Sequence, residues 1–188
     1  MSTTFRKNRR GEVVARLRPE ELALLRGLPS ELRPLVDKPV AADDADVTPA
    51  DPADTPPGEP VESIDDAVRR RLFPLAYLDP TEEAAEKDWQ RMVHPDLVRS
   101  KLEALSLLAA TLERASETRG RAEIVLSPQE TEAWLGALND ARLALGVALN
   151  VTEDLDVDAM TRDDASAAGF EMYSWLTGLQ GELVDALL

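Results

Sequence analysis

The sequence predicts a mainly α protein of the α+β class: a bundle of four to five helices with a small three-stranded antiparallel sheet. Hydrophobic residues make up 44% of the 188 residues but aromatic residues only 4%, so Leu, Ala and Val must form most of the core, as in many helical proteins. Leucines recur at helical spacing in the second half of the chain. Strand-like patterns are short and lie at residues 5–17 and 121–126.

Residues 1–36 are expected to contribute a hairpin and a short helix to the main domain. Gly11 lies at the centre of the hairpin, where a tight turn favours the positive φ that glycine adopts freely. An isolated hairpin is only marginally stable in water, so we expect residues 121–126 to pair with it as a third strand. The helix that follows should end at residues 27–30, which contain Gly and Pro, before a second short turn at 31–36.

Residues 37–63 differ from the rest of the chain in composition. They are rich in Pro, Ala and Asp, contain no aromatic residue, and carry eight acidic residues against one Lys. Such a segment buries too little apolar surface to offset the entropy of ordering. We therefore predict a disordered acidic insertion, followed by a helical core at residues 64–188.

The helical core is expected to begin with three helices. The first spans residues 65–73. The second begins with Asp79 as its N-cap and ends at Pro95, since proline breaks a helix interior. His94 then lies at a helix boundary, where it would cap the second helix. The third helix covers residues 96–116.

Two further helices complete the predicted core. Ser127, Pro128 and Glu130 combine a capping box with a proline at the first helical position, which places a helix from there to about Asn150. The last helix carries one apolar face, formed by Met172, Leu176, Leu179, Leu183 and Leu187. Trp175 widens this face, which suits either a monomer core or a two-fold partner; we favour a homodimer.

The composition argues against several classes of function. With 36 acidic and 21 basic residues, the chain has a net charge of −15, which repels nucleic acid and anionic membranes from most of its surface. It has no cysteine and a single histidine, so no Cys or His pair can bind zinc. The acidic residues 153–158 lack the Gly and Glu that a calcium loop requires. We predict no catalytic, cofactor or metal site, and no enzyme.

The sequence contains no apolar run near the roughly 20 residues that cross a bilayer. The basic residues near the N-terminus are not followed by the apolar stretch of a signal peptide. A cytoplasmic protein without membrane contact is therefore expected.

Two groups of polar residues are candidates for function. Asn139, Asp140 and Arg142 lie in the middle of an apolar helix, where such residues form either a buried polar network or an interface. The second group is basic: residues 1–18 hold six basic residues and one acidic residue, a local charge of about +5. The hairpin members of this group are Arg6, Lys7, Arg9, Arg10 and Arg16.

The basic N-terminal hairpin, called the basic ribbon below, admits three interpretations. It can contact the protein's own acidic surface or an acidic partner, it can enter a DNA groove as a two-stranded ribbon, or it can have no specific role. Stacking on single-stranded nucleic acid is not favoured, because Phe5 is the one aromatic residue in the segment.

Two segments, DDAVRRRLFPLAYLD and ETEAWLGALNDARLALGVALNV, resemble an actinobacterial family of formerly unknown function that includes the oxidative-stress transcription regulator AosR. The resemblance extends over nearly the whole chain. It implies a cytoplasmic, non-enzymatic accessory transcription regulator that acts through contacts with a stress-responsive sigma factor or RNA polymerase and is linked to cysteine-biosynthesis genes. The alternatives are a direct DNA-binding regulator and an adaptor in regulated proteolysis.

One property of the family does not transfer to this chain. Redox sensing in the family is attributed to cysteines, and this sequence has none. A thiol–disulfide switch requires a sulfur nucleophile. The resemblance therefore leaves the activating signal of this protein open.

Overall fold

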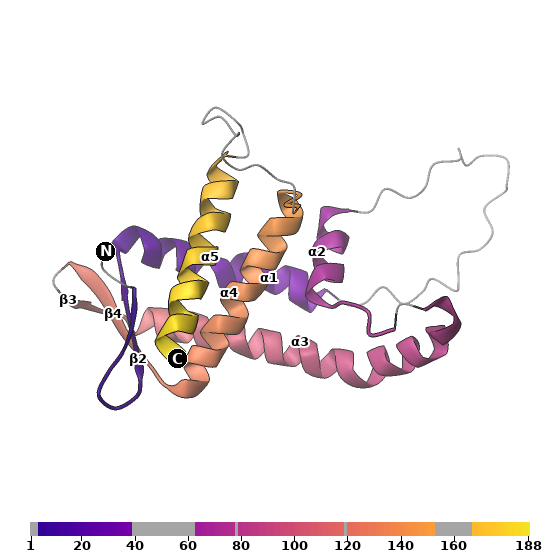
Figure 1. The fold of residues 1–188 in the computed structure, drawn as a ribbon, viewed down its shortest axis with the longest axis horizontal. Coiled ribbons are helices and arrows are strands. Elements are labelled where there is room, and N and C mark those ends of the chain that lie inside the picture. Colours follow the sequence, from indigo (N-terminus) through magenta and orange to yellow (C-terminus); the bar gives the residue numbers. More distant parts are fainter. Residues whose placement is uncertain (1–3, 39–62, 78, 119, 153–166) are drawn as a thin grey trace.

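The computed structural model describes residues 4–38, 63–77, 79–118, 120–152 and 167–188. Its chain order is β1, β2, α1, α2, a 3₁₀ turn η1, α3, β3, β4, α4 and α5. Figure 1 shows the helices packed together, with the strands gathered at one end of the molecule. The predicted mainly α fold, with a small antiparallel sheet built from the N-terminal hairpin and a later strand, is confirmed.

The sheet has the strand order β1-β2-β4-β3, and all its pairs are antiparallel. Its strands are β1 (Phe5–Lys7), β2 (Val13–Leu17), β3 (Ser116–Thr118) and β4 (Arg121–Leu126). β4 pairs with the hairpin strand β2, as the sequence predicts, with Ala15 opposite Ile124. β3 is an addition that the sequence did not indicate. It covers the free edge of β4, which would otherwise leave backbone groups without partners.

Side chains alternate across the sheet, and one face is buried in the core. The buried positions are Phe5, Val13, Ala15, Leu17, Ala122, Ile124 and Leu126. The opposite face carries Arg6 and Arg16 and remains exposed. This alternation fixes the register, because a slip of one residue would turn the apolar set outward.

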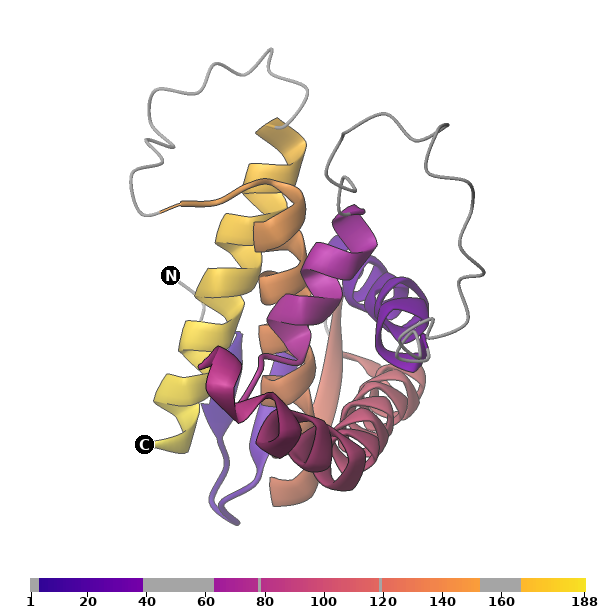
Figure 2. The same cartoon turned by 90° about the vertical axis from the view of Figure 1, so that its right-hand side faces the viewer.

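The described residues form five helices that pack on one another, and all of them except α2 also contact the sheet. They are α1 (Pro19–Asp37), α2 (Ile64–Leu72), α3 (Glu83–Glu113), α4 (Pro128–Ala148) and α5 (Ala167–Leu187), with η1 (Pro80–Glu82) leading into α3. Figures 1 and 2 show α4 and α5 side by side, while the long helix α3 runs across one end of α4. In Figure 1, α3 extends past α4 beneath the short helix α2.

The prediction of two short helical segments before residue 37 was wrong, because α1 continues through Pro29 and Pro34. An interior proline removes a backbone hydrogen bond and generally costs about 3 kcal/mol. Here the buried side chains Leu25, Leu32 and Val36 lie on one stripe with Pro29 itself. Packing of this stripe on both sides of Pro29 offsets the local cost.

The predicted division at Pro95 was also wrong, because α3 is one helix of 31 residues with Pro95 inside it. Pro95 is exposed, and the carbonyl that loses its partner belongs to the exposed residue Arg91, where water can satisfy it. His94 is therefore not a capping residue. Its ring packs on Phe73 with a centroid distance of 4.7 Å, and burial, together with nearby Arg69, lowers its pKa.

The N-terminus of α4 confirms the capping box that the sequence predicts. The Ser127 side chain accepts a hydrogen bond from the backbone of Glu130, and the Glu130 carboxylate accepts one from the backbone of Ser127 at 2.8 Å. Arg114 binds both oxygens of the same carboxylate at 2.6 and 2.8 Å. This bidentate pair joins the end of α3 to the start of α4.

Replacing Glu130 with Gln is expected to lower the free energy of unfolding at pH 7 by about 1–2 kcal/mol. Arg114 and the Ser127 amide hold the pKa of Glu130 at about 2 rather than the ordinary 4.5. A depressed carboxyl pKa stabilises the folded state above the unfolded-state pKa, and that contribution is lost as pH falls from about 4.5 to about 2. Urea unfolding at several pH values should show the deficit shrinking across this interval. Glu132→Gln, on the same helix but exposed, should show no comparable change.

Two predicted segments lie mainly or wholly outside the described residues. The acidic insertion at 37–63 falls there except for Asp37, Lys38 and Ser63, and so do residues 153–158. Within the described residues, Lys38 pairs with Asp66 of α2 at 2.8 Å, and Ser63 caps α2. No helix in the described part of the chain is long and apolar enough to cross a membrane.

Candidate protein-interaction surface

An open groove of about 400 Å³ lies between α3 and α4. Its apolar wall includes Leu97, Ala104 and Leu107 of α3. Two carboxylates, Glu103 of α3 and Glu132 of α4, also line it and are exposed. The groove therefore combines apolar area with negative charge.

A second open hollow, of about 670 Å³, runs along α3 and is continuous with the first. Glu103, Leu107 and Gln129 line both, and the second hollow adds the apolar side chains Val98 and Leu102. We call the combined surface the α3 face. It is defined by Leu97, Val98, Leu102, Glu103, Leu107, Gln129 and Glu132.

The α3 face exists because α3 has more apolar residues than the core can cover. Leu105, Leu108 and Leu112 are fully buried and form the packed stripe. Leu97, Leu102 and Leu107 remain half-buried, and because a step of five residues turns an α-helix by about 140°, they lie on different sides of α3 rather than in one stripe. An apolar stripe wider than one packed face is typical of a helix that contacts more than one neighbour. The apolar residues of α3 that lie outside its buried stripe were the signal for the α3 face, and the sequence interpretation missed it.

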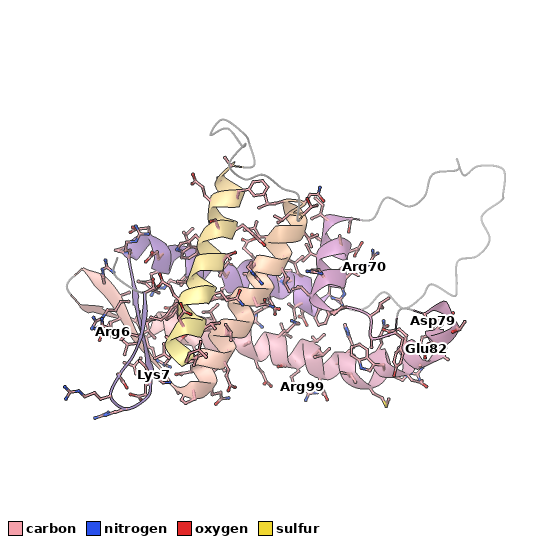
Figure 3. The ribbon with its side chains drawn as sticks, in the orientation of Figure 1. Arg6, Lys7, Arg70, Asp79, Glu82 and Arg99 are labelled. Atoms are coloured by element: carbon pink, nitrogen blue, oxygen red, sulfur yellow. The ribbon has the colours of Figure 1, made fainter. Side chains whose placement is uncertain are left out.

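The charges of the α3 face are only partly neutralised within the chain. Arg99, which also lines the second hollow and is labelled beneath α3 in Figure 3, pairs with Asp96. Glu103 and Glu132 form no ion pair or hydrogen bond with another described residue. Both carboxylates are therefore available to a cationic group from outside.

Asp140, a residue predicted from the sequence, lies at the inner side of the groove and is 5% exposed. Its carboxylate accepts a hydrogen bond from Lys101 Nζ of α3 at 2.7 Å. Burial raises the pKa of Asp140, while the Lys101 charge acts in the opposite direction. Lys101 Nζ also lies 5.6 Å from the centre of the Phe73 ring, a cation–π contact that links α3 to the end of α2. The sequence interpretation did not identify Lys101.

Asn139 and Arg142 make different contacts from Asp140, so the three predicted residues do not form one network. Asn139 Oδ1 accepts hydrogen bonds from Arg142 Nη2 at 3.4 Å and from Gln180 Nε2 of α5 at 3.5 Å. Arg142 Nε is buried and has no hydrogen-bond partner among the described residues. Asp140 thus joins α4 to α3, whereas Asn139 joins α4 to α5.

The basic residues of the hairpin divide into two kinds. Lys7 Nζ donates to the carbonyl of Leu187 at the end of α5, at 3.2 Å, and Arg16 Nε pairs with Glu123 of β4 at 2.8 Å. These two cations contact the protein itself. Arg6, Arg9 and Arg10 have exposed side chains with no ion pair in the described part of the chain.

Hydrogen bonds with Asn8 fix the backbone of the hairpin turn that carries Arg9 and Arg10. Asn8 Oδ1 accepts hydrogen bonds from the backbone of Arg10 at 2.8 Å and of Glu12 at 3.0 Å. Gly11 has φ of +81°, as expected for its place in the turn. Figure 3 shows Arg6 and Lys7 at one end of the molecule's long axis and Asp79 and Glu82 at the other. The basic residues of β1 are therefore well separated from the acidic residues that lead into α3.

No group of three or more His, Asp or Glu side chains that could hold a metal ion occurs among the residues that the structure describes. The chain does match a known family, DUF2017, described as a domain of unknown function, over residues 2–187. The chain belongs to the DUF2017 family. The resemblance that the sequence analysis identified is therefore confirmed.

The curated relatives of this DUF2017 chain carry a regulatory name. It is 33% identical over 184 residues to a Mycobacterium leprae protein with the AosR name, covering 90% of this chain and 80% of the relative. It is 31% identical over 183 residues to the oxidative stress regulator AosR of Mycobacterium bovis and to that of Mycobacterium tuberculosis, covering 92% of this chain and 80% of each relative. No solved structure matches the chain.

Proposed function

We propose that this chain is a non-enzymatic accessory transcription regulator that acts through protein contacts. Its partner is a stress-responsive sigma factor, which it binds through the α3 face. The name of the mycobacterial relatives, oxidative stress regulator, supports the regulatory role. The partner and the surface are inferred from the chemistry of the α3 face.

The observation that carries the proposal is the combination of apolar hollows with two available carboxylates. Leu102 and Leu107 offer half-buried apolar surface, and Glu103 and Glu132 lie beside it without pairing to a described residue. An apolar groove bordered by carboxylates suits an amphipathic helix that carries Lys or Arg at its edges. Proteins that bind DNA present such basic surfaces, and the net charge of −15 would speed their encounter with this chain.

The double variant Glu103→Lys/Glu132→Lys is expected to weaken sigma-factor binding by about ten- to a hundredfold, because two attractive charge contacts become repulsive. Fluorescence anisotropy of the labelled protein against the host's stress-responsive sigma factor would measure the change. A matched control is Glu171→Lys/Asp185→Lys on α5, which changes the net charge equally at two other exposed positions. Equal losses in both variants, or none in either, would contradict the α3 face as the binding surface.

A direct DNA-binding role is the second candidate, and the exposed side chains of Arg6, Arg9 and Arg10 favour it. Promoter duplex titrated in parallel distinguishes the two. If the ribbon binds DNA, Arg9→Ala/Arg10→Ala lowers the slope of log affinity against log salt by about one to two. Salt-resistant binding to the sigma factor in the absence of duplex supports the protein-contact function instead.

A further inference from the structure

A third hollow, separate from the α3 face and likewise open to solvent, lies among α1, α2, α4 and α5. Its volume is about 340 Å³, and apolar side chains such as Leu32, Val68 and Leu145 line most of it. Met172 of α5 lines the same hollow, is half-buried and packs against the core. This volume is many times that of a water molecule, so a small peroxide fits within it. A thioether thus borders a hollow that a small oxidant can enter.

We propose that Met172 is a peroxide-sensitive modification site that controls the packing of α2. The proposal rests on the proposed function in a stress response. With no cysteine in the chain, a thiol cannot sense an oxidant, and methionine is the other side chain whose oxidation cells reverse enzymatically. The oxidant is hydrogen peroxide or another small peroxide.

The reaction is a two-electron oxygen transfer. The sulfur of Met172 attacks one oxygen of hydrogen peroxide, so that an S–O bond forms while the O–O bond breaks. The departing hydroxide takes up the remaining peroxide proton and leaves as water. The product is methionine sulfoxide, whose oxygen is a strong hydrogen-bond acceptor.

The hollow is poorly suited to the oxidised side chain. Its two acidic lining residues, Glu31 and Asp65, accept hydrogen bonds in their ionised form but cannot donate them. The remaining lining side chains, apart from Met172, are aliphatic. A sulfoxide oxygen packed against aliphatic walls gains no donor there, so its hydrogen bonds must come from water that enters the packing. Oxidation therefore favours conformations in which Met172 leaves its contacts with the core and the hollow widens.

Helix α2 is the wall most easily displaced. It has nine residues and contributes only Val68 and Leu72 to the buried core. It leads directly into Phe73, whose ring contacts Lys101, the partner of Asp140 in the α3–α4 groove. Loosening of α2 thus removes a contact that supports the α3 face.

Met92 provides a control within the same chain. It is 70% exposed on α3, so we expect it to react with peroxide more readily than Met172 and its sulfoxide to lie in water without disturbing the packing. Met1 and Met160 lie outside the described residues. Leu is the matched replacement at either position, since it keeps the apolar volume and removes the sulfur.

The test treats the full chain with hydrogen peroxide, locates sulfoxides by peptide mass spectrometry and measures hydrogen–deuterium exchange of α2. We expect α2 exchange to rise roughly tenfold in the wild type and in Met92→Leu, because a half-buried apolar side chain becomes polar and loses part of its packing. It should not rise in Met172→Leu. Methionine sulfoxide reductases A and B should restore the original rate, and Met172→Gln should show faster exchange without peroxide.

The proposal is overturned if Met172 resists oxidation while Met92 is converted, or if α2 exchange is unchanged once Met172 is oxidised. An equal rise in Met172→Leu would also overturn it. Binding of the untreated wild type and of Met172→Leu to the sigma factor is measured separately. If the untreated wild type does not bind the sigma factor, the proposed function is contradicted, but the oxidation result is unaffected.

Discussion

Replacing Lys101 with Met is expected to lower the free energy of unfolding by about 3 kcal/mol at pH 7, because a buried carboxylate loses its partner. Asp140 is 5% exposed, and among the described residues it forms an ion pair with Lys101 at 2.7 Å. The methionine fills the space of the lysine stem but offers no charge or donor. Urea unfolding followed by circular dichroism would measure the loss.

The pH dependence of this variant identifies the cause. Burial already raises the pKa of Asp140 above its ordinary 3.8, and removal of the Lys101 charge raises it further. A carboxyl group with a raised pKa in the folded state binds its proton more tightly there than in the unfolded state. Stability of the variant should therefore increase as pH falls through the raised pKa towards 3.8. A simple loss of packing would give a deficit that does not change with pH.

A double variant separates the ion pair from its surroundings. Lys101→Met/Asp140→Leu removes both charges and should regain most of the lost stability, since replacing a buried pair with apolar residues is often neutral. Asp140→Leu alone leaves the more exposed Lys101, whose side chain is 21% exposed, and should cost less than Lys101→Met. If the double variant were less stable than either single variant, the pair would not be the source of the effect.

The parts of the fold that local signals determine could be predicted from the sequence. Gly11 placed the hairpin turn, and Ser127 with Glu130 placed the start of α4, because each acts through hydrogen bonds or dihedral angles within a few residues. The pairing of residues 121–126 with the hairpin followed from the rule that a hairpin needs a third strand.

The errors occurred where distant packing outweighed a local signal. Pro29 and Pro95 both predicted helix ends, yet α1 and α3 run through them. Pro29 lies on the buried stripe of α1, and the sequence showed that stripe as Leu25, Leu32 and Val36. Strand β3 could not be foreseen, because its three residues form a strand only by pairing with β4.

The candidate site was only partly predictable for the same reason. Asn139 and Asp140 were conspicuous as polar residues in an apolar helix, and both line the α3–α4 groove. Their partners lie on other helices: Lys101 is 39 positions from Asp140 and Gln180 is 41 from Asn139. Spacing within α4 cannot identify such partners. The sequence of α3 shows more leucines than one buried stripe needs. Whether they line a groove depends on the position of α4, which the sequence of α3 does not give.

Replacing Trp134 with Ala is expected to have the largest effect on stability, about 3–5 kcal/mol. Trp134 is fully buried at the junction of three parts of the fold. Its Nε1 donates to Thr111 Oγ1 of α3 at 2.7 Å, and its ring meets Phe5 of β1 edge-to-face, with centroids 6.0 Å apart. The side chain thus connects α4 to both α3 and the hairpin, and its loss leaves a cavity that all three share.

Two smaller changes separate the contributions of Trp134. Thr111→Val removes the acceptor of the buried indole N–H and should cost about 1–3 kcal/mol. Phe5→Leu removes the edge-to-face contact, worth about 0.5–1.5 kcal/mol beyond area, and should speed hydrogen exchange in β1 and β2 more than in α3. Two outcomes would show that Trp134 stabilises the fold only by filling space in the core. They are an unchanged stability of Thr111→Val, and an equal rise of hydrogen exchange in α3 and in the hairpin of Phe5→Leu. The expected asymmetry would instead establish that one side chain anchors the basic hairpin to the helical bundle.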